Sequence, residues 1–105
     1  MQVNRDIFDA IRDGKKKVET RAASVKHLGI KAGDSLKMVC GDDFFVKKAL
    51  KVQLFKTIDD MLKRYEVRQI NPNMGTRGEL EELYFSFPGY KEKIASMGLI
   101  AIELE

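Results

Sequence analysis

The sequence has one cysteine, one histidine, two prolines and no tryptophan. Because Cys40 has no second cysteine to pair with, an internal disulfide is excluded, which favours the reducing cytoplasm. His27 alone can build neither a Ser-His-Asp triad nor a histidine-rich metal site, and we expect no metal or other cofactor. No apolar run approaches the roughly 18 residues that cross a bilayer, and residues 1–14 lack the apolar stretch of a signal peptide. We therefore predict a cytoplasmic protein without a membrane-spanning segment.

Length and composition predict one small globular domain. The 105 residues fall in the most common range of domain sizes, about 100–150 residues. Hydrophobic residues make up 44% and charged residues 33%, a balance typical of folded rather than disordered chains. No repeat, low-complexity stretch or Pro/Gly-rich linker divides the sequence. We therefore treat residues 1–105 as a single domain and expect a monomer.

Charge is distributed unevenly along the chain. The formal net charge is +3, but residues 1–56 carry a net +6 and residues 57–105 a net −3. The basic excess is concentrated in residues 12–26, where it could supply the field that attracts the phosphates of a nucleic acid. The same cluster could also be a solvated surface that keeps the protein soluble. Charge alone does not decide between these two readings.

Hydrophobic periodicity predicts short helices interspersed with strands. Asn4 is expected to cap the first helix and Gly14 to end it, whereas the turn-rich segment 70–78 is expected to be a loop. This order of elements predicts an α+β domain in which a mixed sheet curls into a barrel. Helices are expected at residues 3–12, 58–65, 79–87 and, as one further turn, 90–96; strands are expected at residues 18–22, 35–40, 44–55 and 99–104.

The most informative segment is Gly14-Lys15-Lys16-Lys17-Val18-Glu19-Thr20-Arg21. It joins the end of a helix to a strand, and alternation in that strand would place Lys17, Glu19 and Arg21 on one face. Charged side chains on a strand that faces a cleft are costly unless they are paired or functional. Glu19 and Arg21 are close enough to neutralise each other, and the guanidinium could dock a phosphate or a base edge. The alternative is a surface strand whose charges face water.

The pattern Gly14-x-Lys16-x-x-Glu19-x-Arg21 resembles the signature of the ASCH domains, which are relatives of the PUA-like barrels. The resemblance continues through the turn at residues 29–34, through Phe87-Pro88-Gly89-Tyr90 and through the closing strand 99–104, so it covers nearly the whole chain. It implies a PUA-like mixed β-barrel flanked by short helices, with a cleft lined by the Lys, Glu and Arg of the motif.

The ASCH family is generally regarded as binding RNA or nucleotides. Some small bacterial members hydrolyse 4-acetylcytidine to cytidine and acetate, and others have been described as ribonucleases. In the amidohydrolase branch the lysine of the motif activates a threonine, and a later glutamate assists. Lys16 matches that lysine, but Glu19 stands at the threonine position. The later glutamate would fall in residues 70–78, which contain no acid, although Glu79 follows directly.

The motif face suggests roles for five side chains. Glu19 could act as a general base on water, and Lys16 could donate a proton or stabilise an oxyanion. We expect the neighbouring Lys15 and Lys17 to lower the pKa of Lys16 and to contribute to ligand binding. Arg21 would hold the phosphate or carbonyl of a substrate.

Aromatic residues gather near Pro88-Gly89, and most of them are expected to belong to the core. Either Tyr84 or Tyr90 could instead stack on a base, as aromatic side chains do in readers of single-stranded RNA. The sequence thus predicts a domain that binds RNA, a nucleotide or a nucleoside. The alternatives are a small hydrolase of a modified nucleoside or of RNA, and a protein-interaction domain whose charged strand is only surface.

Overall fold

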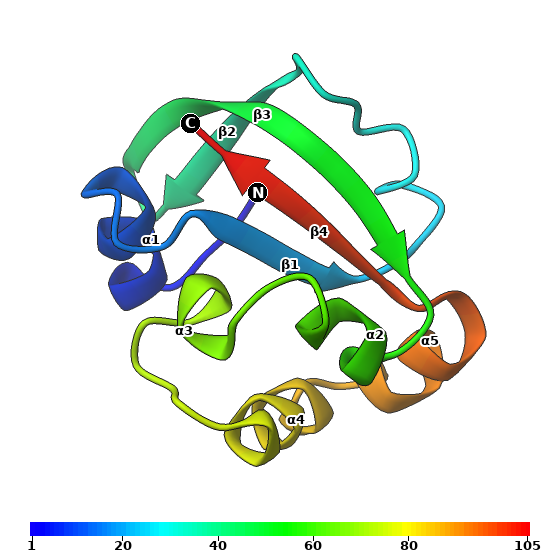
Figure 1. Ribbon diagram of the computed structural model, residues 1–105. Helices are drawn as coiled ribbons and strands as arrows, with labels where there is room; N and C mark the ends of the chain where they lie inside the picture. The colour runs from blue at the N-terminus through cyan, green and yellow to red at the C-terminus, as the bar shows by residue number, and fades with distance from the viewer.

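A four-stranded antiparallel sheet forms the centre of the computed structural model, which describes residues 1–105 (Figure 1). A mixed sheet was expected, but every strand pairs antiparallel with its neighbours, and the sole parallel contact is the isolated bridge between Gln2 and Val39. The strands lie in the order β1-β4-β3-β2, so β1 and β2 are the two edges. The four strands are β1 (Val18–Ala22), β2 (Ser35–Cys40), β3 (Asp43–Phe55) and β4 (Leu99–Leu104).

The curl of the sheet comes from β3, whose 13 residues pair with two different strands. Its first half pairs with β2, ending at Ser35 opposite Lys48, and its second half pairs with β4. The register shifts between Ala49 and Lys51, and such a bulge bends a strand and increases its twist. The sheet therefore curls through half of a barrel and does not close.

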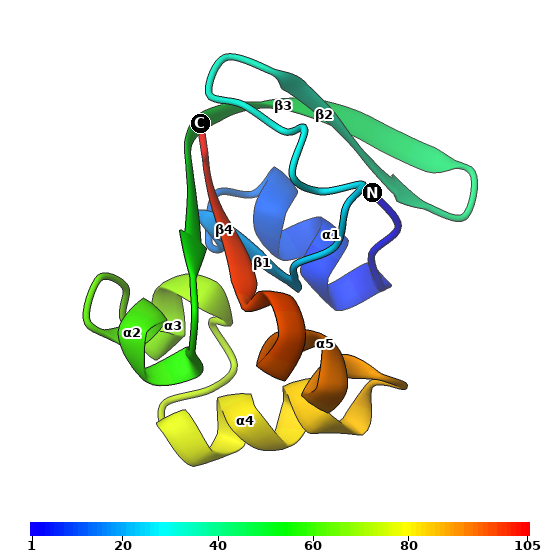
Figure 2. The same cartoon turned by 90° about the vertical axis from the view of Figure 1, so that its right-hand side faces the viewer.

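Five helices surround the sheet, and the expected N-cap of the first is confirmed: the Asn4 side chain accepts a hydrogen bond from Ile7 N at 2.9 Å. The helix expected at residues 58–65 ends at Leu62, and a separate helix begins at Val67 after four intervening residues. Figure 2 shows α1 within the curl of the sheet and the other four helices gathered together away from it. The helices are α1 (Arg5–Arg12), α2 (Ile58–Leu62), α3 (Val67–Ile70), α4 (Arg77–Ser86) and α5 (Tyr90–Met97). None of them is long and apolar enough to span a membrane.

The strand β4 separates two hydrophobic clusters and contributes to both. Leu99 and Ala101 belong to the cluster that α2, α3, α4 and α5 cover, whereas Ile100, Ile102 and Leu104 belong to the cluster beneath α1. A strand buried on both faces needs apolar residues at successive positions, which explains the sequence of β4. Because β1 pairs with β4, its position between the two clusters is fixed by the core.

Gly98 makes the tight connection from α5 into β4 and provides a test of this arrangement. Its φ is +79°, and a Cβ atom there would lie 2.1 Å from the backbone oxygen of Phe55. We expect Gly98→Ala to lower the free energy of unfolding by about 2 kcal/mol or more, because the strained backbone and the clash add together. Urea denaturation measures this change. Gly29→Ala is the control, since a Cβ at Gly29 meets nothing within 4 Å, and equal losses in both variants would contradict the prediction.

Candidate functional site

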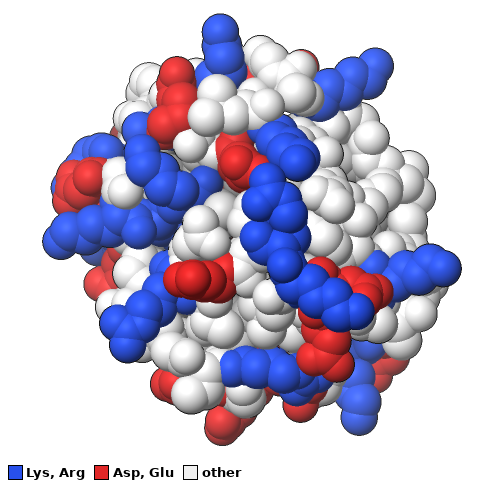
Figure 3. All heavy atoms as spheres, viewed as in Figure 1, with Lys and Arg blue, Asp and Glu red and all other residues white.

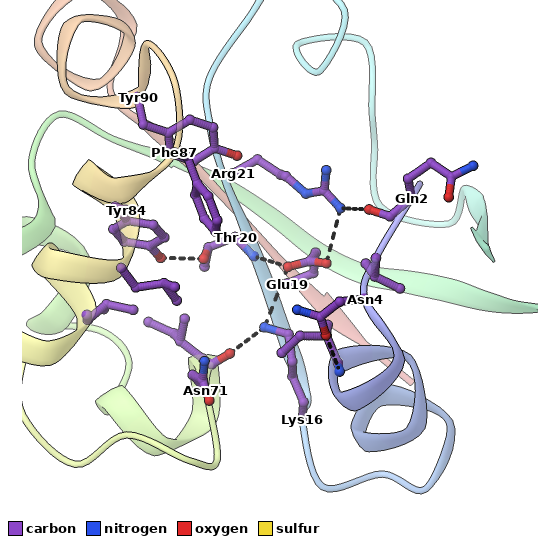
Figure 4. Close-up of a pocket in the computed structure, with 15 residues that line it drawn as sticks. Gln2, Asn4, Lys16, Glu19, Thr20, Arg21, Asn71, Tyr84, Phe87 and Tyr90 are labelled. Atoms are coloured by element: carbon purple, nitrogen blue, oxygen red, sulfur yellow. Dashed lines mark hydrogen bonds and ion pairs between the residues drawn. The ribbon is translucent and has the colours of Figure 1, made fainter. Parts of the chain in front are cut away.

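A cavity of about 380 Å³ opens beside β1, between the segment before α1 and the helices α3 and α4 (Figure 4). Its volume is in the range of small-molecule sites, roughly 300–1,000 Å³. Apolar side chains line about half of it, and the remainder is polar. Polar groups that converge in a hollow also lined by apolar and aromatic side chains are typical of a ligand site. The polar lining consists of Gln2, Asn4, Lys16, Glu19, Thr20, Arg21 and Asn71, with the hydroxyl groups of Tyr84 and Tyr90.

The polar side chains gather here because the open edge of β1 faces the cavity. Leu104 N donates to Lys17 O, so the odd-numbered residues of β1 direct their backbone groups toward β4. The even-numbered Val18 and Thr20 therefore direct theirs toward the cavity. Backbone groups at a buried edge need partners, and two side chains of the motif supply them.

Lys16 supplies a hydrogen-bond donor to the carbonyl group of Val18 at this edge. Its side chain is buried, with 3% of the residue exposed, and Nζ donates to Val18 O at 2.6 Å and to Ile70 O. Nζ also lies 3.5 Å from Glu19 Oε1. Of the three N–H donors of the ammonium group, two are bonded to backbone carbonyl oxygens, and the group also forms the ion pair with Glu19. Lys16 therefore links β1 to α3 and holds the carboxylate of Glu19 in place.

Burial has the largest influence on the pKa of Lys16 and lowers it, while the Glu19 carboxylate acts in the opposite direction. The expected direction is thus confirmed, but the expected cause is wrong. Lys15 and Lys17 are exposed and do not line the cavity, and Arg21 is the nearby cation that lowers the pKa further.

Glu19 offers the cavity an unused hydrogen-bond acceptor. The residue is 5% exposed, and Oε1 accepts from Thr20 N at 2.9 Å. Oε2 is buried and has no hydrogen-bond partner. Arg21 Nη2 lies 3.6 Å from Oε2 but donates to Gln2 O at 2.9 Å instead. A buried charged acceptor without a donor is costly, and a ligand that supplied an N–H or O–H group would relieve that cost.

Two amide side chains add free donors to the lining. Asn4 Oδ1 accepts from Ile7 N in the cap of α1, and Asn71 Oδ1 accepts from Asn73 N at 2.9 Å. Neither amide N–H₂ group makes a hydrogen bond within the protein, and Figure 4 shows both residues at the cavity. Neither residue was predicted as a site residue from the sequence. Asn4 was interpreted only as a helix cap and Asn71 only as part of a loop.

The aromatic side chains differ in their suitability for stacking. Tyr84 is buried in the first cluster, its hydroxyl group is hydrogen-bonded to Thr20 Oγ1, and burial raises its pKa. Tyr90 stacks against Tyr84 with ring centroids 6.2 Å apart and meets Phe87 edge-to-face at 5.0 Å. Phe87 is 41% exposed, so its ring is open to a ligand. Phe87 was not among the predicted site residues, although it lies in the motif Phe87-Pro88-Gly89-Tyr90.

Of the residues predicted to form the site, Lys16, Glu19, Arg21, Tyr84 and Tyr90 line one cavity. Lys15 and Lys17 lie outside that cavity.

Other candidate residues lie elsewhere. Glu79 is exposed and caps α4 by accepting hydrogen bonds from Gly75 and Thr76, so it does not reach the cavity. His27 Nδ1 lies 3.1 Å from Ser24 Oγ in a turn, and Cys40 packs half-buried against the second cluster. No group of three or more His, Cys, Asp or Glu side chains is placed to hold a metal ion.

Comparisons with known proteins identify the fold and no activity. No family model matches the sequence, and no curated protein does. The crystal structure of the hypothetical protein PH0355 superposes on the whole chain and on 94% of its own, with a TM-score of 0.88 and 26% identity. The solution NMR structure of protein PF0455 from Pyrococcus furiosus matches the whole chain and 96% of its own, with a TM-score of 0.77 and 24% identity. The α+β arrangement with its curled sheet therefore occurs, over its full length, in other proteins.

Proposed function

We propose that this chain is an ASCH-type, PUA-like domain that binds a nucleobase, either of RNA or of a free nucleotide or nucleoside, in the cavity beside β1. The observation that carries the proposal is the buried Glu19 Oε2, which has no hydrogen-bond donor and only the Arg21 guanidinium 3.6 Å away, in a cavity with an open aromatic ring on its wall. The sequence motif that resembles the ASCH signature supplies the same Lys16, Glu19 and Arg21.

A nucleobase presents the chemical groups that this lining requires. Its flat ring can stack on Phe87 or Tyr90. Its N–H or amino groups can donate to Glu19 Oε2, and its carbonyl or ring nitrogen atoms can accept from the amides of Asn4 and Asn71. The combination of stacking with edge recognition is the usual way in which proteins bind unpaired bases.

The charges around the cavity suit a ligand that carries phosphate. Lys16, Glu19 and Arg21 together leave one positive charge, and Arg21 is the least buried of the three. Lys15 and Lys17 are exposed in the turn before β1, where Figure 3 shows basic side chains gathered over α1 and that turn. These lysines lie where they can attract the phosphates of a longer RNA without entering the cavity.

An NMR titration of ¹⁵N-labelled protein with cytidine, cytidine 5′-monophosphate and short single-stranded RNA tests the proposal. We expect saturable shifts of the amides of Glu19, Thr20 and Arg21, and RNA affinity that falls as salt rises, because phosphate contacts release counterions. Absence of saturable shifts with every nucleoside, nucleotide and RNA would overturn the proposal. The same shifts with a protein partner alone would favour the interaction-domain reading instead.

Stacking can be tested separately from edge recognition. We expect Phe87→Leu and Tyr90→Leu each to weaken ligand affinity by roughly fivefold to a hundredfold, since base–aromatic stacking contributes about 1–3 kcal/mol. The control is Phe85→Leu, because Phe85 is 40% exposed on α4 but does not line the cavity. Isothermal titration calorimetry measures the affinities. If Phe87→Leu and Tyr90→Leu bind the ligand as tightly as the control Phe85→Leu, stacking at this wall is excluded.

The second candidate function is hydrolysis of a modified nucleoside such as 4-acetylcytidine. The observation that favours it is the buried Lys16–Glu19 pair, in which Glu19 Oε2 could accept a proton from water. We expect binding without turnover, because Lys16 Nζ is buried between two backbone carbonyl groups and the Glu19 carboxylate, which disfavours transfer of its proton to a leaving group. Acetate released from 4-acetylcytidine in proportion to protein concentration would establish the hydrolase in place of the binding module.

A further inference from the structure

The strand β3 has an open edge on the side of the sheet away from β1. Its partner β2 ends at Ser35, opposite Lys48. The chain before β2 extends the pairing by one residue, since Gly33 N donates to Ala49 O and Ala49 N donates to Asp34 O. From residue 50 to residue 55, β3 has β4 as its only strand partner, so one side of this stretch is unpaired.

The pairing with β4 shows which backbone groups are free. Glu105, the residue directly after β4, donates its backbone N–H to Lys48 O. The odd-numbered residues of β4 therefore also direct their backbone groups toward β3. In the observed register these residues face Lys51, Gln53 and Phe55. The residues between them, Val52 and Leu54, therefore direct their N–H and C=O groups toward the open edge. An edge of this kind can accept another strand.

An apolar groove of about 450 Å³ runs along this edge, between β3 and the loop that precedes β2. Three of its side chains are half exposed: Leu50 at 56%, Leu54 at 51% and Leu28 at 47%. Ile30, Ala32, Val52 and Ile100 complete its apolar lining. Contiguous exposed apolar side chains on a small soluble domain mark an interaction site more often than chance exposure.

The two segments that form the sides of the groove carry only basic charge, although Asp34 and Glu105 lie next to them. The segments 23–33 and 44–56, which form its two sides, contain six lysines and no Asp or Glu. Lys31 and Lys51 line the groove itself. Two copies of the chain paired edge to edge would bring these lysines together, which disfavours a second copy as the occupant.

We propose that this groove binds an extended segment of a partner protein in which apolar and acidic residues alternate. The segment adds to β3 as a further strand and pairs with the free backbone groups of Val52 and Leu54. Its apolar side chains cover Leu28, Leu50 and Leu54, and its carboxylates lie beside the lysines. The groove lies along β3, whereas the cavity lies at the opposite edge of the sheet, beside β1. The proposal therefore does not depend on the function of that cavity.

A heptapeptide of alternating Glu and Val, capped at both ends, is the probe for this proposal. Titrated into ¹⁵N-labelled protein, it should shift the amides of Leu28, Val52 and Leu54 saturably. At saturation we expect the amide exchange of Val52 and Leu54 to slow by about tenfold or more, because these N–H groups gain acceptors. The amides of Gln53 and Phe55, already bonded to β4, should change less.

Three comparisons decide the outcome. A peptide of alternating Lys and Val should bind at least about tenfold more weakly, because its charges repel the lysines. A Glu/Val peptide N-methylated at alternate positions should lose binding, since it cannot pair with the strand edge. Leu54→Lys should also abolish binding while the cavity variants retain it. Equal binding of the basic or N-methylated peptide, self-association of the free protein through these amides, or single-stranded RNA shifting Val52 and Leu54 would each overturn the proposal.

Discussion

Replacing Lys16 by methionine should lower the free energy of unfolding by about 3–5 kcal/mol, the usual cost of removing one member of a buried ion pair. Methionine fills similar space but leaves the buried Glu19 carboxylate without its cation. It also removes the donor that Val18 O and Ile70 O share, so the open edge of β1 loses its link to α3. Urea denaturation followed by circular dichroism measures the change.

Two further variants show whether the loss of stability comes from the ion pair between Lys16 and Glu19. Lys17→Met is the matched control, because Lys17 is exposed beside Lys16, and its effect should stay within about 0.5 kcal/mol. The double variant Lys16→Met/Glu19→Gln should recover part of the loss, since the uncompensated charge is removed. If Lys16→Met does not fold, a cooperative unfolding transition in the double variant still shows that the uncompensated Glu19 charge caused the loss. Equal stabilities of Lys16→Met and Lys17→Met would contradict the assigned role of Lys16.

The second large effect concerns ligand affinity. Glu19→Gln should weaken binding of cytidine by roughly tenfold to a hundredfold, because a hydrogen bond to a charged acceptor contributes about 1.5–3 kcal/mol. The amide keeps the shape of the side chain and can still accept from Thr20 N. It then directs its N–H₂ group, a donor, toward the donor of the ligand. Isothermal titration calorimetry and the amide shifts described above measure the loss.

Glu82→Gln is the control for this prediction, because Glu82 is an exposed carboxylate on α4 that does not line the cavity. Its affinity for cytidine should equal that of the wild-type protein. Weaker cytidine binding by Glu19→Gln could reflect either the lost hydrogen bond or misfolding. Urea denaturation separates the two, since a misfolded variant would also lose its cooperative unfolding transition. Cytidine affinity unchanged in a folded Glu19→Gln would remove Glu19 from the site and with it the main support for nucleobase binding.

The sequence predicted the strands better than the helices. Strands β1, β2 and β4 have the expected bounds, because alternation and the apolar run of β4 are local signals. The boundary between α2 and α3 was missed because it depends on a capping interaction, in which Gln69 Oε1 accepts from Glu66 N at 2.8 Å. A glutamate at the cap position is an unusual start signal. The antiparallel order of the sheet depends on contacts between distant segments and cannot be read from periodicity.

For the candidate site too, the sequence gives local signals but not the contacts between distant segments. Alternation within a strand grouped Lys17 with Glu19 and Arg21, but the strand begins at Val18, and it is Lys16 that turns back toward the cavity. The same alternation places Thr20 on the opposite face of the strand from Glu19. Both line the cavity, because the cavity lies at the edge of β1, where side chains from both faces of the strand can reach it. The contributions of Asn71 after α3 and of Leu80 and Leu83 on α4 depend on the tertiary fold and have no local signal, whereas Tyr84 on α4 was predicted from the aromatic cluster.

The position of β4 also bears on how fast the domain folds. β1 pairs with β4 across about 80 residues of intervening chain, and β3 pairs with it across about 50. Pairings between such distant segments must overcome a large loss of chain entropy before they contribute stability, so folding should be slow for a chain of this length. The cavity wall joins residues near 3, 20, 70 and 87, and it exists only after these long-range pairings have formed. A ligand of the cavity should therefore slow unfolding and leave the rate of folding unchanged.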